Sequence, residues 1–166
     1  ADVDGDGWLD LYVCDRSGPN ALFVSEGLGP DGQVSFTDEA VARGVDRGDD
    51  PSFAAGFLDV DDDGDADLYL ANDHGTGCWV FRNHLFRNDG GVFTDVTDDG
   101  TQGCLDAMCV AIGDFDGDGR QDLFSTNTPA GHALMLNRLP RPWVRAEREA
   151  GVAGFAVGWG AAFLDF

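Results

Sequence analysis

The chain has 166 residues, 43% of them hydrophobic, and a formal net charge of -21 from 31 acidic and 10 basic side chains. This length and hydrophobic content indicate a folded globular domain and not an acidic disordered tail. The negative charge excludes nucleic-acid binding, which needs a basic surface, and disfavours an anionic membrane surface. No apolar run is long enough for insertion through a bilayer.

An acidic motif recurs along the chain at intervals of about 55 residues. It is first met in the opening stretch ADVDGDGWLDLYV, where Asp alternates with other residues, Gly follows, and another Asp comes three residues after that Gly. The copies run from Asp2 to Asp10, from Asp59 to Asp67 and from Asp114 to Asp122. Asp165, in the phrase FLDF, takes the first position of a fourth copy.

The segments around each motif also repeat. AAGFLD, VAIGDF and GAAFLD precede a motif, LDLYV, ADLYL and QDLFS follow one, and no helical periodicity is sustained. Each unit is predicted to read strand, acidic loop, strand, connection, strand, turn, strand. Such a unit is typical of a β-propeller blade, which buries its faces against its neighbours. We expect an all-β protein of about three four-stranded antiparallel blades, a partial propeller or part of a larger one. Its repeats span approximately 1–53, 54–108 and 109–159, and 160–166 starts a fourth.

The acidic loops have the chemistry of a calcium site. Asp at positions 1, 3 and 5 brings three carboxylates together in one tight turn, and Gly at position 6 permits the sharp bend. Hard oxygen ligands at this density suit Ca²⁺, with Mg²⁺ second, whereas Zn²⁺ would need His or Cys. Position 7 is expected to contribute its backbone carbonyl, which leaves its side chain free to vary. We predict about three calcium ions, held by Asp2, Asp4, Asp6, Trp8 and Asp10, by Asp59, Asp61, Asp63, Asp65 and Asp67, and by Asp114, Asp116, Asp118, Arg120 and Asp122.

An EF-hand is the alternative that the first residues of the motif suggest. It needs a bidentate Glu at position 12 and a helix on both sides. Position 12 is Val13, Leu70 or Ser125, and the flanking segments have the pattern of strands. The closing acid stands at position 9 instead. The pattern therefore predicts a nine-residue loop joining two strands, with a structural role for the ion.

The phrases FLDVDDDGDADLYLAND, HLFRNDGGVFTDVT and GWGAAFLDF resemble FG-GAP/VCBS repeats, the repeats of the integrin α-subunit propeller and of many bacterial secreted proteins. The closest likeness is to the group that includes cartilage acidic protein. The resemblance implies a calcium-loaded β-propeller that is secreted and extracellular, at the cell surface or in the periplasm. It implies cell adhesion or ligand binding and no single reaction.

The connections away from the acidic loops are expected to share the opposite face, where binding usually occurs on a rigid scaffold. They comprise 14–21, 43–52, 71–84 and 127–133. His74, Trp79, Phe81 and His84 could form a sugar- or protein-binding patch there, or simply pack between loops. A zinc pair of the two histidines is disfavoured. The tripeptide Arg-Gly-Asp at 47–49 is a match short enough to arise by chance.

Four cysteines also fall on or beside that face. They allow three pairings, and none forms a CxxC motif. We favour Cys14–Cys78 and Cys104–Cys109, with buried free thiols as the alternative.

Three classes of function remain from the sequence. The first is a calcium-stabilised module that binds a protein or glycan ligand. The second is a structural subunit that self-associates head to tail, because the chain opens inside a loop and the C-terminal VGWGAAFLDF is a strand of the type that should precede it. Truncation of a longer propeller explains the same ends. The third is the propeller part of a secreted carbohydrate-active enzyme, although no catalytic residues are recognisable, so the chain is predicted not to be an enzyme.

Overall fold

The computed structural model describes residues 1–73, 82–98, 100–103, 105–127 and 131–164. Within these residues the fold is all-β apart from one four-residue helix, as the sequence predicts. The elements are β1 (Leu11–Val13), β2 (Ala21–Leu28), β3 (Val34–Asp38), α1 (Ala40–Arg43), β4 (Ser52–Leu58), β5 (Asp67–Asn72), β6 (His84–Asp89), β7 (Val92–Asp95), β8 (Val110–Gly113), β9 (Asp122–Ser125), β10 (Ala133–Leu136) and β11 (Val144–Arg145).

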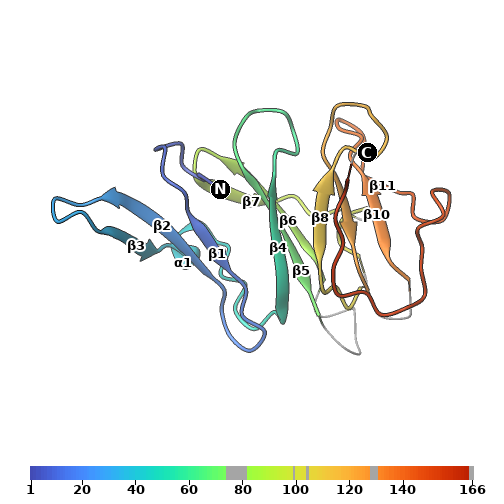
Figure 1. Cartoon of the computed structure of the whole chain (residues 1–166), viewed down its shortest axis with the longest axis horizontal. Helices are drawn as coiled ribbons and strands as arrows, with labels where there is room; N and C mark the ends of the chain where they lie inside the picture. The colour runs from blue at the N-terminus through green and yellow to red at the C-terminus, as the bar shows by residue number, and fades with distance from the viewer. Residues whose placement is uncertain (74–81, 99, 104, 128–130, 165–166) are drawn as a thin grey trace.

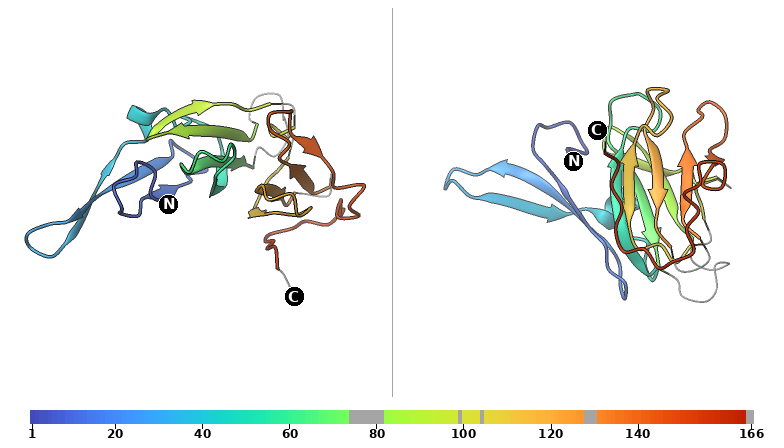
Figure 2. Two further views of the ribbon diagram at one scale, coloured as in Figure 1. Left: turned by 90° about the horizontal axis from the view of Figure 1, so that it is seen from above. Right: turned by 45° about the vertical axis from the view of Figure 1, so that its right-hand side comes forward.

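These strands form three antiparallel sheets in the order of the chain. The first sheet has the order β1-β2-β3, the second β4-β5-β6-β7, and the third β11-β10-β9-β8. Every pairing is between consecutive strands, so each sheet is a meander, as in propeller blades. Figure 1 shows the three sheets standing side by side, and Figure 2 shows the β2–β3 hairpin extending away from the other two.

Strand β5 explains why the middle sheet needs a neighbour on both sides. All six of its residues are buried, although side chains along a strand alternate between the two faces of the sheet. Leu68 and Leu70 enter a cluster with Leu22 and other side chains of the first sheet. Tyr69 and Ala71 point the opposite way, toward the third sheet.

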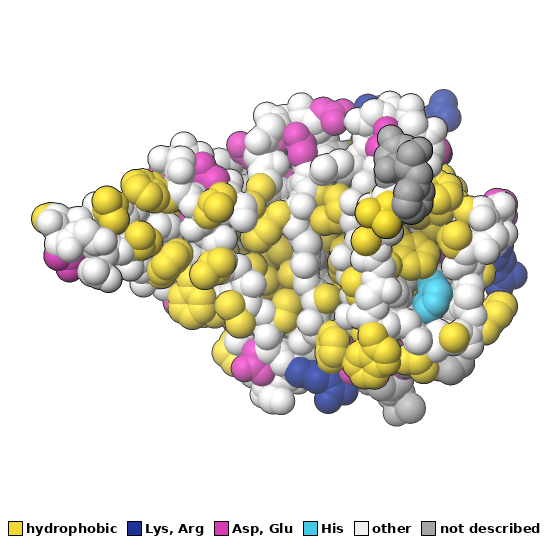
Figure 3. Space-filling view, viewed as in Figure 1, with side chains coloured by type: hydrophobic (Ala, Val, Ile, Leu, Met, Phe, Trp, Pro, Cys, Tyr) yellow, Lys and Arg dark blue, Asp and Glu magenta, His cyan; other side chains and the backbone are white. Residues whose placement is uncertain are grey.

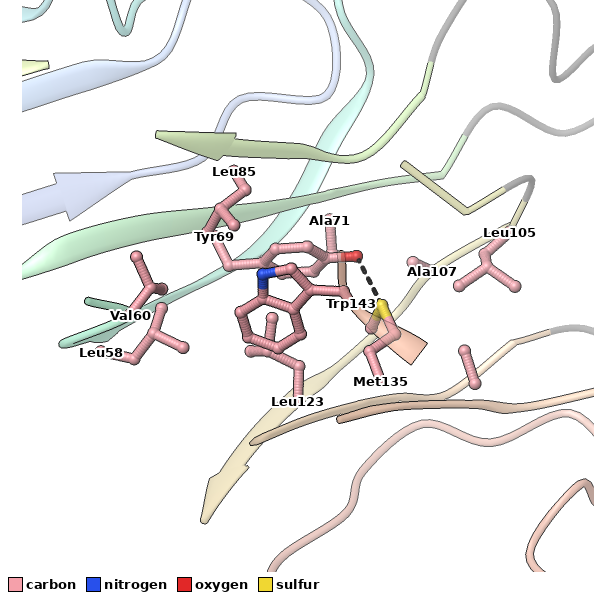
Figure 4. Packing of buried hydrophobic residues seen from close by; sticks show 11 residues of the cluster. Leu58, Val60, Tyr69, Ala71, Leu85, Leu105, Ala107, Leu123, Met135 and Trp143 are labelled. Atoms are coloured by element: carbon pink, nitrogen blue, oxygen red, sulfur yellow. Dashed lines mark hydrogen bonds between the residues drawn. The ribbon is translucent and has the colours of Figure 1, made fainter. Parts of the chain in front are cut away.

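The second cluster fills the space between the middle and third sheets (Figure 4). Tyr69 lies at its centre, packed with Leu123, Met135 and Trp143. The Tyr69 hydroxyl is fully buried, and it donates to the backbone carbonyl of Thr101 at 2.9 Å. Burying such side chains stabilises the stack by about 1.5–3 kcal/mol each, so the blades are held together by two hydrophobic interfaces.

The last described segment differs from the expected strand. The sequence predicts a strand over VGWGAAFLDF (157–166), but the described part, 157–164, forms no strand, because no second strand pairs with it among the described residues. It nevertheless lies against β8, where Phe163 covers Gly113 and meets the ring of Phe115 at a centroid distance of 6.3 Å. Apolar side chains are spread across this face of the molecule, from β1 through β4 to the C-terminal segment (Figure 3). Exposed large apolar side chains of these segments include Leu11, Val13, Phe53, Trp159 and Leu164.

Candidate metal centre

All three acidic loops lie at the same end of the stack, where they connect the first two strands of a blade or lead into β1 (Figure 1). The carboxylate at position 1 folds each loop around itself. Asp2 accepts backbone hydrogen bonds from Gly5 at 2.8 Å and Gly7 at 2.8 Å. Asp114 accepts the equivalent bonds from Gly117 at 2.8 Å and Gly119 at 2.9 Å. The sequence spacing is thus converted into a compact turn with its acids on the inside.

Glycine is required at position 6 of this turn. Gly7, Gly64 and Gly119 adopt φ values of 91°, 93° and 90°, a region that side-chain-bearing residues rarely enter. Position 4 is left-handed too, and in the second loop it is occupied by Asp62 at φ 63°. Asp tolerates this conformation better than most residues, so the turn keeps its shape in all three copies.

The acid at position 9 is the buried anchor of each loop. Asp67 is fully buried and accepts two backbone hydrogen bonds, from Val60 at 2.7 Å and from Asn88 at 2.6 Å. One donor belongs to the loop and the other to the third strand of the blade. Asp10 and Asp122 make the same pair of bonds, with distances of 2.8 Å throughout. Position 9 therefore ties the loop to its sheet.

The acid at position 3 points its carboxylate toward the inside of the loop. In the first two loops one oxygen, Asp4 Oδ1 or Asp61 Oδ1, is buried without a hydrogen-bond partner. A buried acceptor left unpaired lowers the stability of the folded state by about 1–3 kcal/mol, so a cation bound to these oxygens would stabilise the protein. Their other oxygens face arginines, Arg43 at 3.0 Å and Arg87 at 4.0 Å.

Three acids in each loop converge closely enough to hold one ion. Their oxygens lie within 4.8 Å of one another, from positions 1, 3 and 5 in the first loop and from positions 1, 3 and 9 in the other two. The converging sets are Asp2, Asp4 and Asp6, then Asp59, Asp61 and Asp67, then Asp114, Asp116 and Asp122. An all-oxygen donor set of this charge fits Ca²⁺ better than a transition metal.

The electrostatics of the second loop show the cost of leaving its acids without a cation. Burial raises the pKa of Asp67 to about 6, despite its two backbone hydrogen bonds. Burial and the neighbouring charge of Asp63 also raise the pKa of Asp61. A divalent ion among these carboxylates would favour their charged forms and remove that cost.

In the third loop an arginine side chain partly neutralises the negative charge of the acids. Arg138 donates to Asp116 and, at 2.8 Å, to Asp118, so one guanidinium bridges positions 3 and 5. These contacts lower the pKa of Asp116. An ion bound here must compete with an arginine that is already hydrogen-bonded to two of its ligands.

The remaining predicted residues contribute to the turn or pack elsewhere. At position 5, Asp6, Asp63 and Asp118 each accept a bond from the backbone N–H of position 7. The position 7 side chains leave the centre: the indole of Trp8 lies against Gly27, Asp65 accepts a bond from Gly90 at 2.7 Å, and Arg120 lies 3.5 Å from Asp62. The predicted ligand role of their backbone carbonyls stays a prediction.

Two buried asparagines complete the centre and were missed in the sequence. Asn88, fully buried in β6, donates from Nδ2 to the carbonyl of Val3 at 2.8 Å, and Asn137 donates to the carbonyl of Val60 at 2.8 Å. Each asparagine thus holds position 2 of the loop in the preceding blade. The signal was present, because Asn ends both LFRN and LMLN, but nothing in the sequence shows that these side chains reach across a blade interface.

Replacing Asn88 with Ala should destabilise the protein by about 2 kcal/mol, because the buried carbonyl of Val3 loses its donor. Asn88 also accepts a bond from the Gly91 N–H at 2.7 Å, which would be lost too. Urea unfolding monitored by tryptophan fluorescence measures this change. The control is Gln33→Ala at an exposed turn, and a loss no larger than that of the control would contradict the role assigned to Asn88.

The opposite end of the stack carries the other connections, as the antiparallel register requires. His84 begins β6 at that end and is buried, with Nδ1 at 3.1 Å from Asp95 Oδ2. His74, Trp79 and Phe81 lie outside the described residues, so the expected patch stays a prediction. Cys78 and Cys104 lie outside them too, but Cys14 and Cys109 are free thiols, so the favoured Cys14–Cys78 and Cys104–Cys109 pairings are not formed and the free-thiol alternative agrees with the structure. Cys14 and Cys109 are not bonded to each other, and burial raises the pKa of Cys14 to about 11.

Comparison with known protein families identifies the repeat. A family model described as an FG-GAP-like repeat matches residues 2–70 and again residues 59–125. Each match includes two of the acidic loops. No curated protein matches the sequence. Among the described residues, no helix has the length and apolar character needed to cross a membrane.

Proposed function

Because the chain belongs to the FG-GAP-like repeat family, we propose that it is a calcium-stabilised extracellular module that binds a protein or carbohydrate through the face opposite its acidic loops. Repeats of this family are typical of extracellular proteins and are often involved in binding or adhesion. The calcium, the location and the ligand are parts of the proposal.

The observation that carries the calcium part is the unpaired buried oxygen at position 3. Asp4 Oδ1 and Asp61 Oδ1 are buried, point among other carboxylates and have no hydrogen-bond partner. In each loop three acids converge inside a turn that is closed by backbone hydrogen bonds, and their oxygens form the donor set that Ca²⁺ prefers. When bound, the ion would neutralise the loop acids, while the chain's own backbone N–H groups keep the turn folded.

The proposed ligand binding is supported by the different structures of the two ends of the stack. At one end the acids and their hydrogen bonds fix each turn, so these loops serve the scaffold. At the other end the connections carry polar side chains on a rigid sheet, which is where recognition usually occurs. We propose binding and not catalysis, because no nucleophile with its base is placed there among the described residues.

Calcium titration of the EDTA-treated protein by isothermal calorimetry tests the first part. We expect about three ions per chain, with the third loop weakest because Arg138 occupies two of its acids. Mg²⁺ should bind less tightly, since it keeps more of its own water. The triple variant Asp4→Asn, Asp61→Asn, Asp116→Asn retains the shape of the loops and should lose most of the binding. Equal binding by this variant would contradict the site.

The recognition part is tested on a glycan array and on immobilised extracellular-matrix proteins, each with calcium and with EDTA. The proposal expects a ligand whose retention falls in EDTA and with the triple variant. If ligand retention is the same in EDTA and with the triple variant, recognition does not depend on the calcium loops, and this part of the proposal is wrong.

A further inference from the structure

A cavity of about 350 Å³ opens between the connection from blade 1 to blade 2 and the start of β6. It lies at the end of the stack opposite the acidic loops, because β6 begins and β7 ends there. Its lining is polar and consists of Arg47, Arg82, His84, Asp95 and Thr97. The volume is at the small end of the range for ligand pockets, about 300–1,000 Å³, so it suits one sugar-sized molecule and not a long chain.

The charge of this cavity is unlike that of the rest of the molecule. The chain carries a net charge of -21, yet two of its ten arginines line this one cavity. Arg82 donates to the neutral side chain of Gln102 at 2.9 Å and, within the part of the chain that the structure describes, forms no ion pair with a carboxylate. Its charge is therefore available to an anion.

Arg47 is held in place by a network of buried and half-buried groups. Its Nε lies 3.0 Å from Asp50 Oδ2, its Nη2 lies 3.0 Å from His84 Nε2, and its guanidinium stands 5.8 Å from the ring centroid of Phe86. The backbone of Arg47 is left-handed, at φ 55°, a conformation that costs a side-chain-bearing residue about 1 kcal/mol or more. The surroundings thus hold a strained residue in a fixed orientation at the wall of the cavity.

The acid of the cavity restricts which anion can enter. Asp95 Oδ2 faces His84 and lies 3.9 Å from Arg47 Nη1, and the side chain remains partly exposed. A dianion such as phosphate would be repelled by this carboxylate. A monoanion is repelled less, and hydroxyl groups that it carries can donate to Asp95 and accept from an arginine. The Thr97 hydroxyl already donates to Asp95 Oδ1, so it is not a donor for the ligand.

We propose that this cavity binds a hexuronate, a sugar whose single carboxylate pairs with Arg82 while its hydroxyl groups donate to Asp95 and accept from Arg47. Arg presents a planar fork of donors that matches a carboxylate, and its neighbour Arg47 is already oriented. This inference rests on the proposed function, since it names a ligand class for the loop face of the same binding module. It also gives the arginine of the Arg-Gly-Asp tripeptide a role in the cavity, because Arg47 is part of the cavity lining.

The test is a titration of the full ¹⁵N-labelled chain in calcium with sodium D-glucuronate, D-glucose and sodium sulfate, followed by amide and arginine Nε–H chemical shifts. We expect saturable shifts at Thr97 and at the cavity arginines with glucuronate, and affinity at least tenfold weaker for glucose and sulfate. Arg82→Gln should weaken glucuronate binding at least tenfold. The control Arg141→Gln, which removes the same charge at an exposed site, should leave it unchanged.

Three results would overturn the proposal: no saturable shift with glucuronate, equal affinity for glucose or sulfate, or equal affinity in the Arg82 and Arg141 variants. If the Arg82 variant fails to fold, the comparison of the three probes on the unaltered chain still decides the matter. Calcium is titrated into the same sample. Calcium binding without glucuronate binding overturns this inference alone, whereas loss of calcium binding overturns the proposed function.

Discussion

Removing calcium with EDTA should lower the melting temperature of the protein by roughly 20 °C relative to the calcium-loaded form. An ion that binds only the folded state, at a hundred times its Kd, stabilises that state by about 2.7 kcal/mol. Three independent loops then contribute about 8 kcal/mol, which is comparable to the whole stability of an ordinary domain. A chain of this size changes its melting temperature by about 2–4 °C for each kcal/mol.

The physical reason lies in the acids themselves. Asp4 Oδ1 and Asp61 Oδ1 are buried without partners, and burial raises the pKa of Asp67 to about 6, so the calcium-free loops hold charges that their surroundings disfavour. The measurement is a thermal melt by circular dichroism in calcium, in magnesium and in EDTA. The control is the triple variant Asp4→Asn, Asp61→Asn, Asp116→Asn, and its melting temperature should change little when calcium is chelated. An EDTA shift below about 3 °C in the unaltered protein would rule out a structural role for the ions.

Substituting Asp67 with Ala should cost about 3–4 kcal/mol even without calcium, because two buried backbone N–H groups lose their acceptor at once. These groups belong to Val60 and Asn88, so the loop and the third strand would separate at one point. The matched conservative change is Asp67→Asn, which retains one acceptor oxygen and should cost roughly half as much.

Urea unfolding in EDTA measures the free energy of unfolding for both variants. Asp49→Ala, at an exposed position of a connecting loop, removes the same charge and should change stability by less than about 0.5 kcal/mol. A loss for Asp67→Ala no greater than for Asp49→Ala would show that position 9 serves only as a ligand. A calcium titration of the Asp67 variants then shows whether this carboxylate also binds the ion.

The regular features of the fold could be predicted because they repeat in phase. Alternating side chains such as Leu68 and Tyr69 have to be buried on both faces, and three copies of one acidic motif indicated both the loops and the blade period. The family match confirms the repeat, and the three sheets confirm the all-β prediction.

The contacts between blades could not be predicted in the same way. Asn88 and Val3 are 85 residues apart, and no local pattern shows that one side chain bonds the other residue's carbonyl. Arg47 was noticed only as part of a tripeptide, since its left-handed backbone and its place in the cavity depend on tertiary packing. The expected strand at 157–166 depends in turn on a partner strand, which no local sequence pattern identifies.

The asparagine bonds also give the stack a direction. Val3 and Val60 are each held by a side chain that comes 85 or 77 residues later, from the blade that follows. During synthesis from the N-terminus, each acidic loop therefore leaves the ribosome well before the asparagine that fixes it. A loop can reach its final stability only once the next blade has been made, so the blades mature in order, each one completing the blade before it.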